Sequence, residues 1–205
     1  LETTKIHSVA GLVGANHGLL MTRQFRSQNH TVSDVDLVGG GTIPKPGEIS
    51  LAHRGVLFLD ELPEFPRTVT ESLRQPLEDG MVSIARAQGR VTFPAKAMLV
   101  AAENPCPCGF YGDATHHCTC STLHIQRYQK RISGPMLDRI DIHLDVPAVK
   151  VEKLATTDLS HNETSETVRT RVQQARDLQT KRFAGTGITA NSDMTSKDVK
   201  LFCEL

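Results

Sequence analysis

Residues 55–62 read "GVLFLDEL", in which the four apolar residues Val56–Leu59 lead directly into Asp60 and Glu61. A continuous apolar run of this kind is typical of a strand buried on both faces of a parallel sheet. Two carboxylates at the carboxyl end of such a strand suit a metal–nucleotide site, where Asp60 holds the metal and Glu61 polarises a water. The alternative is an acidic pair that only marks where a strand meets solvent.

The composition is that of a globular protein with one substantial core, since 39% of the 205 residues are apolar and 22% are charged. Lys+Arg and Asp+Glu tie at 23 each, so any contact with DNA has to come from a local patch. No apolar run approaches the roughly 20 residues of a membrane span, and no signal peptide is visible. We therefore expect no membrane contact. Because four of the five cysteines cluster within 106–120, we expect a reduced, cytoplasmic protein.

Alternating strand and helix patterns across 56–146 predict an α/β domain. Residues 1–50 are rich in turn formers, and we expect loops and short extended pieces there, followed by a short helix at 48–53. A helix is predicted to begin near Pro66 and to end at Gly80, with Val69, Leu73 and Leu77 as its buried stripe and with its last turn distorted by Pro76. The other predicted elements are a β-hairpin over 81–93, a strand over 97–102, a helix over 122–132 and a strand over 140–146.

Beyond Pro147 the sequence turns polar, which predicts a linker and a boundary between a domain of residues 1–147 and a second element of residues 148–205. Ser160 or Thr164 is positioned to cap a helix there. That helix has one apolar face, made of Val168, Val172, Ala175 and Leu178.

Asn104 follows the predicted strand over 97–102. Beside the carboxylates of the first strand, its amide can hydrogen-bond an attacking water or a terminal phosphate. The alternative is a turn residue that precedes Pro105.

Arg139 stands at the start of the predicted strand over 140–146. A guanidinium at such a place stabilises charge on a transferring phosphoryl group, often from a neighbouring subunit. A surface ion pair with Asp138 or Asp141 is the alternative.

The order of these motifs resembles a known family over most of residues 20–185. Four stretches carry the resemblance: "RQFRSQNHTVSDVDLVGGGTIPKPGEISLAHRGVLFLDELPEFPR" at 23–67, "LRQPLEDGMVSIARA" at 73–87, "VAAENPCPCGFYGD" at 100–113 and "RISGPMLDRIDIHLDVPAV" at 131–149. On them the chain resembles the magnesium-chelatase-like AAA+ ATPases, and within these the bacterial competence type.

The resemblance implies a AAA+ core with a parallel sheet flanked by helices, β-hairpin insertions and the start of a C-terminal helical lid. It implies that Asp60 and Glu61 are the Walker B pair, that Asn104 is the sensor-1 residue and that Arg139 is an arginine finger acting in trans. The implied cofactors are ATP and Mg²⁺. Members of the family work as ring oligomers, commonly hexamers, and in the competence branch the implied activity is branch migration on DNA.

The phosphate-binding loop of such an ATPase is missing from the 205 residues. The nearest candidate, Gly39–Lys45, does not match G-x-x-x-x-G-K-[ST], and Pro44 and Pro46 lack the backbone N–H donors that hold phosphate. The family places this loop before the "FRS" stretch at 25–27, hence upstream of Leu1, and places the sensor-2 arginine beyond Leu205. We therefore expect the chain by itself to be inactive towards ATP.

Two groups of basic residues are candidate contacts to nucleic-acid phosphates. Arg86 and Arg90 lie near the tip of the predicted hairpin, which resembles the insertion before sensor 1. Arg23, Arg26 and His30 belong to a second expected insertion. Solvated loop charges are the alternative for both groups.

Cys106, Cys108, Cys118 and Cys120 form two C-x-C pairs separated by nine residues, with His116 and His117 between them. Four soft ligands can enclose a structural Zn²⁺, although the C-x-C spacing is tighter than the usual C-x₂₋₄-C. Free thiols are the alternative.

Two other functions stay open at this point. A metal-insertion ATPase subunit is one, because the magnesium chelatases share the same motif order. The other is a zinc-stabilised binding module without enzymatic activity, in which Asp60 and Glu61 are structural.

Overall fold

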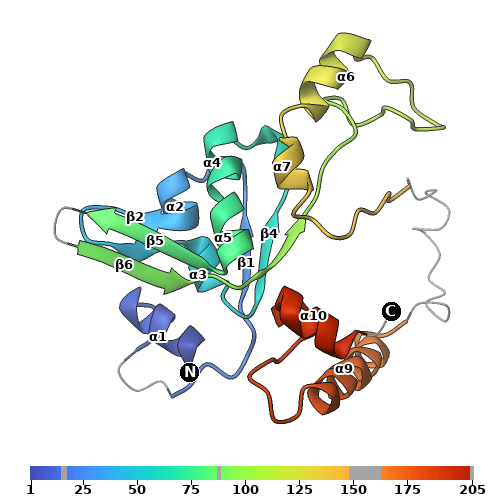
Figure 1. The fold of residues 1–205 in the computed structure, drawn as a ribbon. Helices are drawn as coiled ribbons and strands as arrows, with labels where there is room; N and C mark the ends of the chain where they lie inside the picture. The colour runs from blue at the N-terminus through green and yellow to red at the C-terminus, as the bar shows by residue number, and fades with distance from the viewer. Residues whose placement is uncertain (15–17, 87–88, 148–162, 204–205) are drawn as a thin grey trace. The chain divides into compact units, whose positions relative to one another are not determined.

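The structure is a computed structural model that describes residues 1–14, 18–86, 89–147 and 163–203. The chain divides into two compact units, Leu1–Ala148 and Val149–Leu205. The first unit contains a three-stranded parallel sheet, two short antiparallel strand pairs and several helices (Figure 1). The described part of the second unit is helical. This is the α/β class that the sequence predicts, with a parallel sheet flanked by helices as in a AAA+-like core.

The apolar stretch quoted above forms the central strand of the parallel sheet. The register places Gln28 beside Leu59 and Leu59 beside Ala101, so the three strands end at the same edge. The strands over 56–59 and 98–101 confirm two predictions, whereas the strand over 25–28 lies in a segment where we expected loop. In sheet order, the strands are β1 (Phe25–Gln28), β4 (Val56–Leu59) and β7 (Met98–Ala101).

The two faces of β4 differ in burial. Leu57 and Leu59 are fully buried, but Val56 and Phe58 are only half-buried. Phe58 stacks on Phe25 with a ring-centroid distance of 6.2 Å, and Phe25 remains exposed. The expectation of burial on both faces is therefore wrong for one face of the strand, because the buried apolar cluster gathers on the side of Leu57 and Leu59.

Gly55 allows the chain to enter β4 close to the residue that precedes β1. A Cβ atom at Gly55 would lie 2.0 Å from the carbonyl oxygen of Gln24. The same carbonyl accepts a hydrogen bond of 2.8 Å from the backbone N–H of Val56. Only glycine fits at this position without moving one strand away from the other.

The predicted helix from Pro66 to Gly80 is two helices, α4 (Arg67–Ser72) and α5 (Arg74–Asp79). We expected Pro76 to distort the last turn, but the break lies at Leu73, because a proline ring clashes with the carbonyl four residues earlier, here that of Ser72. Of the predicted buried stripe, Val69 and Leu73 are buried, and Leu77 is only partly buried against the same cluster. Gly80 ends α5 in the left-handed conformation with φ 66°.

The buried apolar cluster of the first unit joins β4 to both of these helices and to the β-hairpin. Figure 1 shows α4 and α5 beside the parallel sheet. The predicted hairpin is confirmed, although its residues 87–88 lie outside the described part of the chain. Its strands are β5 (Met81–Arg86) and β6 (Gly89–Pro94).

Residues 1–50 contain more regular structure than we expected. Ser33 caps a helix that the sequence reading missed, and its hydroxyl accepts a hydrogen bond of 3.1 Å from the Asp36 N–H. The predicted short helix after Gly47 is confirmed. The elements here are α1 (Glu2–Val9), α2 (Asp34–Val38), the antiparallel pair β2 (Gly39–Gly40) and β3 (Lys45–Pro46), and α3 (Glu48–Leu51).

The strand predicted over 140–146 is not formed. Ile142, Leu144 and Val146 are 73%, 80% and 87% exposed, so the alternating apolar residues face solvent. An alternating pattern gives a strand only beside a partner, and none of the described strands pairs with this segment.

The elements on either side of β7 that complete the unit are the 3₁₀ turn η1 (Leu62–Glu64), α6 (Thr122–Gln129) and α7 (Gly134–Leu137).

The second unit begins, in its described part, with a helix capped by Thr164, which accepts a hydrogen bond of 3.2 Å from the Thr167 N–H. The other cap candidate, Ser160, and the predicted linker from residue 148 lie outside the described residues. The apolar face of this helix is exposed at Val168, Val172 and Leu178. The elements are α9 (Ser165–Arg182), the 3₁₀ turn η2 (Asn191–Asp193) and α10 (Ser196–Phe202), and Phe183 packs edge-on against Phe202 at 5.3 Å.

Candidate functional site

Asp60 and Glu61 lie at the carboxyl edge of the parallel sheet, directly after β4. Backbone hydrogen bonds join this point to both neighbouring strands. The Asp60 N–H donates to the Gln28 carbonyl at 3.4 Å, and the Leu62 N–H donates to the Ala102 carbonyl at 2.9 Å. The carboxyl ends of parallel strands are where open α/β sheets bind their ligands. The predicted pair therefore stands where a ligand site is expected.

The backbone of Glu61 adopts the left-handed conformation, with φ 55° and ψ 47°. Few residues other than glycine do so, and such conformations cluster at functional sites. The Asp60 carboxylate accepts a hydrogen bond of 3.0 Å from the Glu61 N–H, which helps to hold the turn. The Glu61 side chain is 48% exposed.

His30 is brought to this site by the structure, although the sequence reading placed it among possible nucleic-acid contacts. Its Nδ1 lies 3.2 Å from Oε2 of Glu61. His30 follows β1 in the chain, and the last residue of β1 pairs with the last residue of β4. The sequence reading did not place His30 at this site because it did not predict β1. A strand over 25–28 puts His30 at the same sheet edge as Glu61.

Asn104 is exposed and follows β7 by three residues. Its strand is the other neighbour of β4, with Ala101 beside Leu59. Asp60, Glu61 and Asn104 therefore leave adjacent strands at one edge of the sheet, as the sequence predicts from their order. Their catalytic and nucleotide-binding roles stay predictions.

Arg139 follows α7 and pairs with a carboxylate of its own chain. It forms an ion pair with Glu78 of α5 and donates to the Pro135 carbonyl at 2.6 Å. The hydrogen bond from Arg139 lowers the pKa of Glu78. The partner is thus neither Asp138 nor Asp141, the two considered from sequence.

No hydrogen bond or ion pair among the described residues joins Arg139 to Asp60 or Glu61. A residue that acts on the site of a neighbouring subunit has no need of such a contact. The arginine-finger role stays a prediction.

The four candidate DNA-contacting arginines differ in how they are held. Arg26 lies in β1, not in an insertion as expected, and donates to both carboxylate oxygens of Glu48 at 2.6 and 2.7 Å. Arg23 donates to the Arg54 carbonyl at 3.1 Å. Arg90 is exposed on β6. The fourth, Arg86, ends β5, and its side chain lies outside what the structure describes.

The Gly39–Lys45 segment contains β2, the turn over 41–44 and the first residue of β3, which pairs antiparallel with β2. A phosphate-binding loop runs instead from a parallel strand into a helix whose N–H groups face the phosphates. The rejection of this segment as a phosphate-binding loop is therefore consistent with its structure.

The structure brings the four clustered cysteines together. Cys106, Cys108, Cys118 and Cys120 have sulfur atoms that all lie within 4.8 Å of one another. Backbone N–H groups of Phe110 and Thr119 lower the pKa of the Cys108 thiol to about 5. The arrangement is able to hold a metal ion.

The family model described as "Magnesium chelatase, subunit ChlI" matches residues 1–154, and "Magnesium chelatase, subunit ChlI C-terminal" matches residues 162–205. The chain belongs to the magnesium chelatase ChlI family. The resemblance seen in the sequence is confirmed. Because this family is one of AAA+ ATPases, its members are expected to use ATP and Mg²⁺.

Two curated relatives match along nearly the whole chain. "Competence protein ComM" of Haemophilus influenzae is 47% identical over 203 residues, which are 98% of this chain and 39% of that protein. "Uncharacterized protein YifB" of Escherichia coli is 45% identical over 206 residues, covering 100% of this chain and 39% of that protein. The chain thus spans about two fifths of the length of these relatives.

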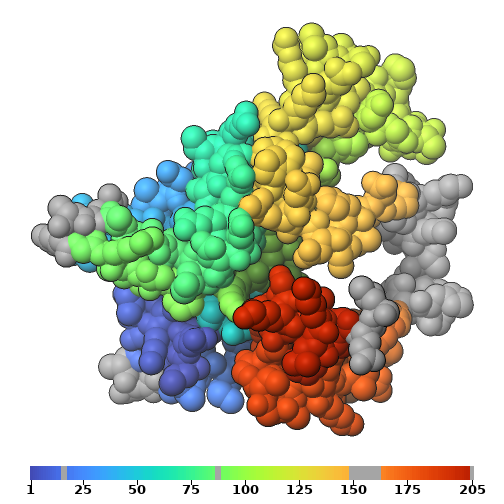
Figure 2. Space-filling view, viewed as in Figure 1, coloured from blue at the N-terminus to red at the C-terminus, as the bar shows by residue number. Residues whose placement is uncertain are grey.

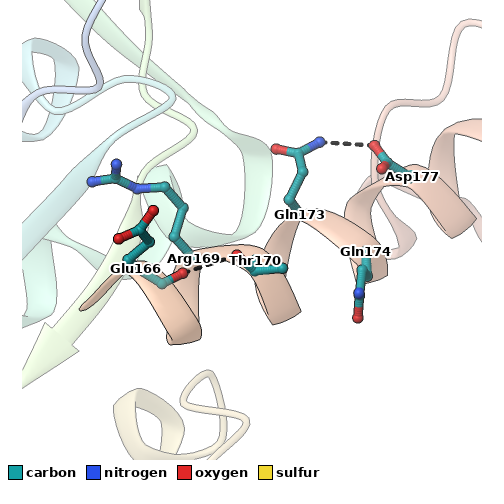
Figure 3. Close-up of a pocket in the computed structure, with 6 residues that line it drawn as sticks. All are labelled: Glu166, Arg169, Thr170, Gln173, Gln174 and Asp177. Atoms are coloured by element: carbon teal, nitrogen blue, oxygen red, sulfur yellow. Dashed lines mark hydrogen bonds between the residues drawn. The ribbon is translucent and has the colours of Figure 1, made fainter. Parts of the chain in front are cut away.

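A second surface, on α9, carries no comparable chemistry. Glu166, Arg169, Thr170, Gln173, Gln174 and Asp177 surround a shallow hollow there (Figure 3). These side chains come from successive turns of the same helix, and Gln173 donates to Asp177 at 2.7 Å. They form a solvated polar face. No helix in the described part of this ChlI-family chain has the length and apolar character to span a membrane.

Proposed function

We propose that this chain carries the Walker B, sensor-1 and arginine-finger part of a cytoplasmic AAA+ ATPase that drives branch migration of DNA. The single observation that carries the proposal is the arrangement at the carboxyl edge of the sheet. Asp60 and Glu61 leave the central strand, while His30 and Asn104 leave the two strands beside it. The family membership and the 47% identity to a competence protein support the same proposal.

The residues at this edge fit the metal and water half of an ATPase site. Asp60 is the exposed carboxylate that would hold Mg²⁺, which neutralises phosphate charge when bound. Glu61 orients the attacking water and accepts its proton, and His30 holds that carboxylate in place. Asn104 donates a hydrogen bond to the water or the terminal phosphate. Arg139 stabilises the transferring phosphoryl group of a neighbouring subunit.

The site is completed by parts that these 205 residues do not contain. The sequence has no G-x-x-x-x-G-K-[ST] motif, and the phosphate grip of an ATPase depends on it. We therefore propose that the chain alone neither binds nor hydrolyses ATP. A protein of the relatives' full length would form a ring, most simply a hexamer, in which Arg139 reaches the adjacent subunit.

DNA contact in this proposal falls to the hairpin β5–β6. Arg90 is exposed on it, and Arg86 lies at its tip in the sequence. Arg26 is a weaker candidate than it was from sequence, because both of its hydrogen-bonded nitrogens face Glu48. Contacts through phosphates give affinity without sequence specificity, as a branch-migration motor requires.

The test uses a protein of the relatives' full length that carries this chain. We expect ATP-driven branch migration of a four-way DNA junction, and we expect Glu61→Gln to lower ATP turnover by about 10²–10⁴-fold while ATP still binds. Glu64→Gln is the matched control, since this nearby carboxylate pairs with Arg131 at 2.6 Å outside the proposed site. It should keep most of the turnover.

Two results would refute parts of this proposal separately. Unchanged turnover in Glu61→Gln would remove Glu61 from the mechanism. Turnover without any binding to DNA would reject the DNA motor and favour the alternative of a metal-insertion subunit, which the description of the matching family supports.

A further inference from the structure

The loop from Glu103 to Ser121 connects β7 to α6 and contains no helix or strand of its own. Every residue of this cysteine loop is described, and only Cys106 among them is buried. Figure 2 shows α6 and the segment before it protruding from the rest of the first unit. Apolar packing therefore does not explain how a loop of this length keeps a defined conformation.

The sulfur atoms of the loop are spaced as the corners of a metal-centred tetrahedron. The Sγ–Sγ distances are 3.4 Å for Cys106–Cys108, 3.6 Å for Cys108–Cys118 and 3.8 Å for Cys106–Cys118. A Zn–S bond of about 2.3 Å in tetrahedral geometry gives an edge of about 3.8 Å. All of these distances are well above the roughly 2.05 Å of a disulfide bond.

The backbone around the sulfur atoms is arranged as it is around metal thiolates. Peptide N–H groups of Phe110 and Thr119 hydrogen-bond the Cys108 sulfur, and those of Cys120 and Cys108 reach the sulfurs of Cys118 and Cys120. Hydrogen bonds of this kind orient the ligands of a metal. Gly109, at φ 82°, makes the turn just after Cys108 and donates to the Cys106 carbonyl at 3.0 Å.

Neither His116 nor His117 belongs to the group of converging ligand atoms, which the four cysteines make up among the described residues. The His116 ring stacks on Phe110 at 4.9 Å, and its Nδ1 lies 2.9 Å from the Thr115 hydroxyl. Asp113 shapes this outer turn by accepting hydrogen bonds of 2.6 and 2.9 Å from the N–H groups of Thr115 and His116. The donor set is thus four sulfurs and no nitrogen or oxygen. A tetrahedral S₄ set selects zinc or iron, and zinc is the ion of structural sites.

We propose that Cys106, Cys108, Cys118 and Cys120 bind one structural Zn²⁺ as a tetrathiolate and thereby fold the cysteine loop. The ion joins two parts of the unit, because Cys106 stands two residues after Asn104 and Cys120 directly precedes Ser121, which caps α6. The amide of Gln129 on α6 donates back to the Pro105 carbonyl at 3.3 Å. Zinc thus fixes the segment that follows Asn104. This proposal does not depend on ATPase activity.

The experiment measures metal and thiols in the chain purified under reducing conditions without chelator. We expect about one zinc ion per chain by elemental analysis, with negligible iron. Cys203 should be the thiol that reacts fast with a thiol reagent, and the cluster thiols should join it only after a strong chelator is added. Exchange into Co²⁺ should give thiolate-to-metal charge-transfer absorption, which reports the ligand set in the unmutated protein.

The variants sharpen this result. Cys106→Ser and Cys118→Ser should each lose zinc, while Cys203→Ser is the matched control that keeps the zinc and loses the fast-reacting thiol. If a serine variant does not fold, the cobalt spectrum of the unmutated chain still decides the question. Freely reactive cluster thiols without zinc, disulfides within the cluster, or bound iron in place of zinc would each overturn the proposal.

Discussion

The two segments that border the candidate site are stabilised in different ways. β4, which ends at Asp60, carries Leu57 and Leu59, both fully buried in the main apolar cluster. The cysteine loop, which contains Asn104, has one buried residue, Cys106, and its sulfur atoms converge instead. The metal and water half of the site therefore depends on apolar packing. The loop after Asn104 depends on sulfur chemistry and hydrogen bonds, so the two sides should respond to different perturbations.

The largest effect is expected from the core of β4. Leu59→Ala should lower the free energy of unfolding by about 2–5 kcal/mol, because it leaves a cavity where a fully buried side chain was. Urea denaturation followed by circular dichroism measures this change. Leu144→Ala is the matched control, since Leu144 is 80% exposed, and its effect should stay within about 0.5 kcal/mol. A comparable loss in both variants would show that the segment over 140–146 packs in solution.

Removal of the proposed metal should affect the cysteine loop more than the sheet. With a strong chelator, chymotrypsin should cut faster at Phe110 and Tyr111, which are exposed in the cysteine loop, while the urea midpoint of the sheet moves less than in Leu59→Ala. The reason is that no residue of the loop belongs to the apolar cluster around β4. Peptide mapping by mass spectrometry identifies the cuts.

The control for this experiment is Cys118→Ser, which should be cut at the same rate with and without chelator. Trypsin provides a second control, because the loop contains no lysine or arginine. Cleavage that ignores the chelator in the unmutated chain would mean that hydrogen bonds alone hold the loop.

The smallest effect is expected in the pH dependence of stability, through the buried His53, which precedes β4 in the chain. His53 is buried, its Nδ1 accepts from the Lys96 N–H at 3.1 Å, and its Nε2 lies 3.1 Å from the Glu2 carboxylate. Burial lowers the pKa of His53, and the hydrogen bond to Glu2 opposes that shift. A folded-state pKa below the unfolded one makes the folded state bind fewer protons. The stability from His53 is therefore present above about pH 6.5 and is lost as the pH falls through the folded-state pKa.

Urea denaturation at about pH 7.5 and pH 5.5 measures this loss. The unmutated chain should lose stability between the two values, and His53→Gln should lose less, because glutamine does not titrate. His143→Gln, at an exposed position, should retain the slope of the unmutated chain. An equal slope in all three proteins would remove His53 from the acid sensitivity.

Much of the fold was predictable because local signals there agree with the packing. The apolar run of β4, the alternation in the β5–β6 hairpin and Gly80 as a helix end each have one simple physical meaning. β1 was missed because "FRSQ" contains a single apolar residue, and its strand conformation comes from pairing with β4. The opposite error occurred at 140–146, where a strong strand pattern has no described neighbour to pair with.

The candidate site was predictable in its order but not in its contacts. The sequence places Asp60, Glu61 and Asn104 at strand ends, and the register confirms that these ends are adjacent. Neither the approach of His30 to Glu61 nor the pairing of Arg139 with Glu78 has a local signal in the sequence. The residues of the first contact are 31 positions apart, and those of the second are 61 positions apart. Contacts of this kind depend on the packed structure as a whole.

Gly55 places a limit on how the family can diverge. The apolar residues of β4 can be exchanged for others of similar volume, but a side chain at Gly55 would displace the Gln24 carbonyl that starts the pairing with β1. A relative that carries another residue at this position must shift one strand against the other, and with it the distance between His30 and Glu61. The residue at this position in a relative therefore indicates whether that relative retains the same carboxylate–imidazole geometry.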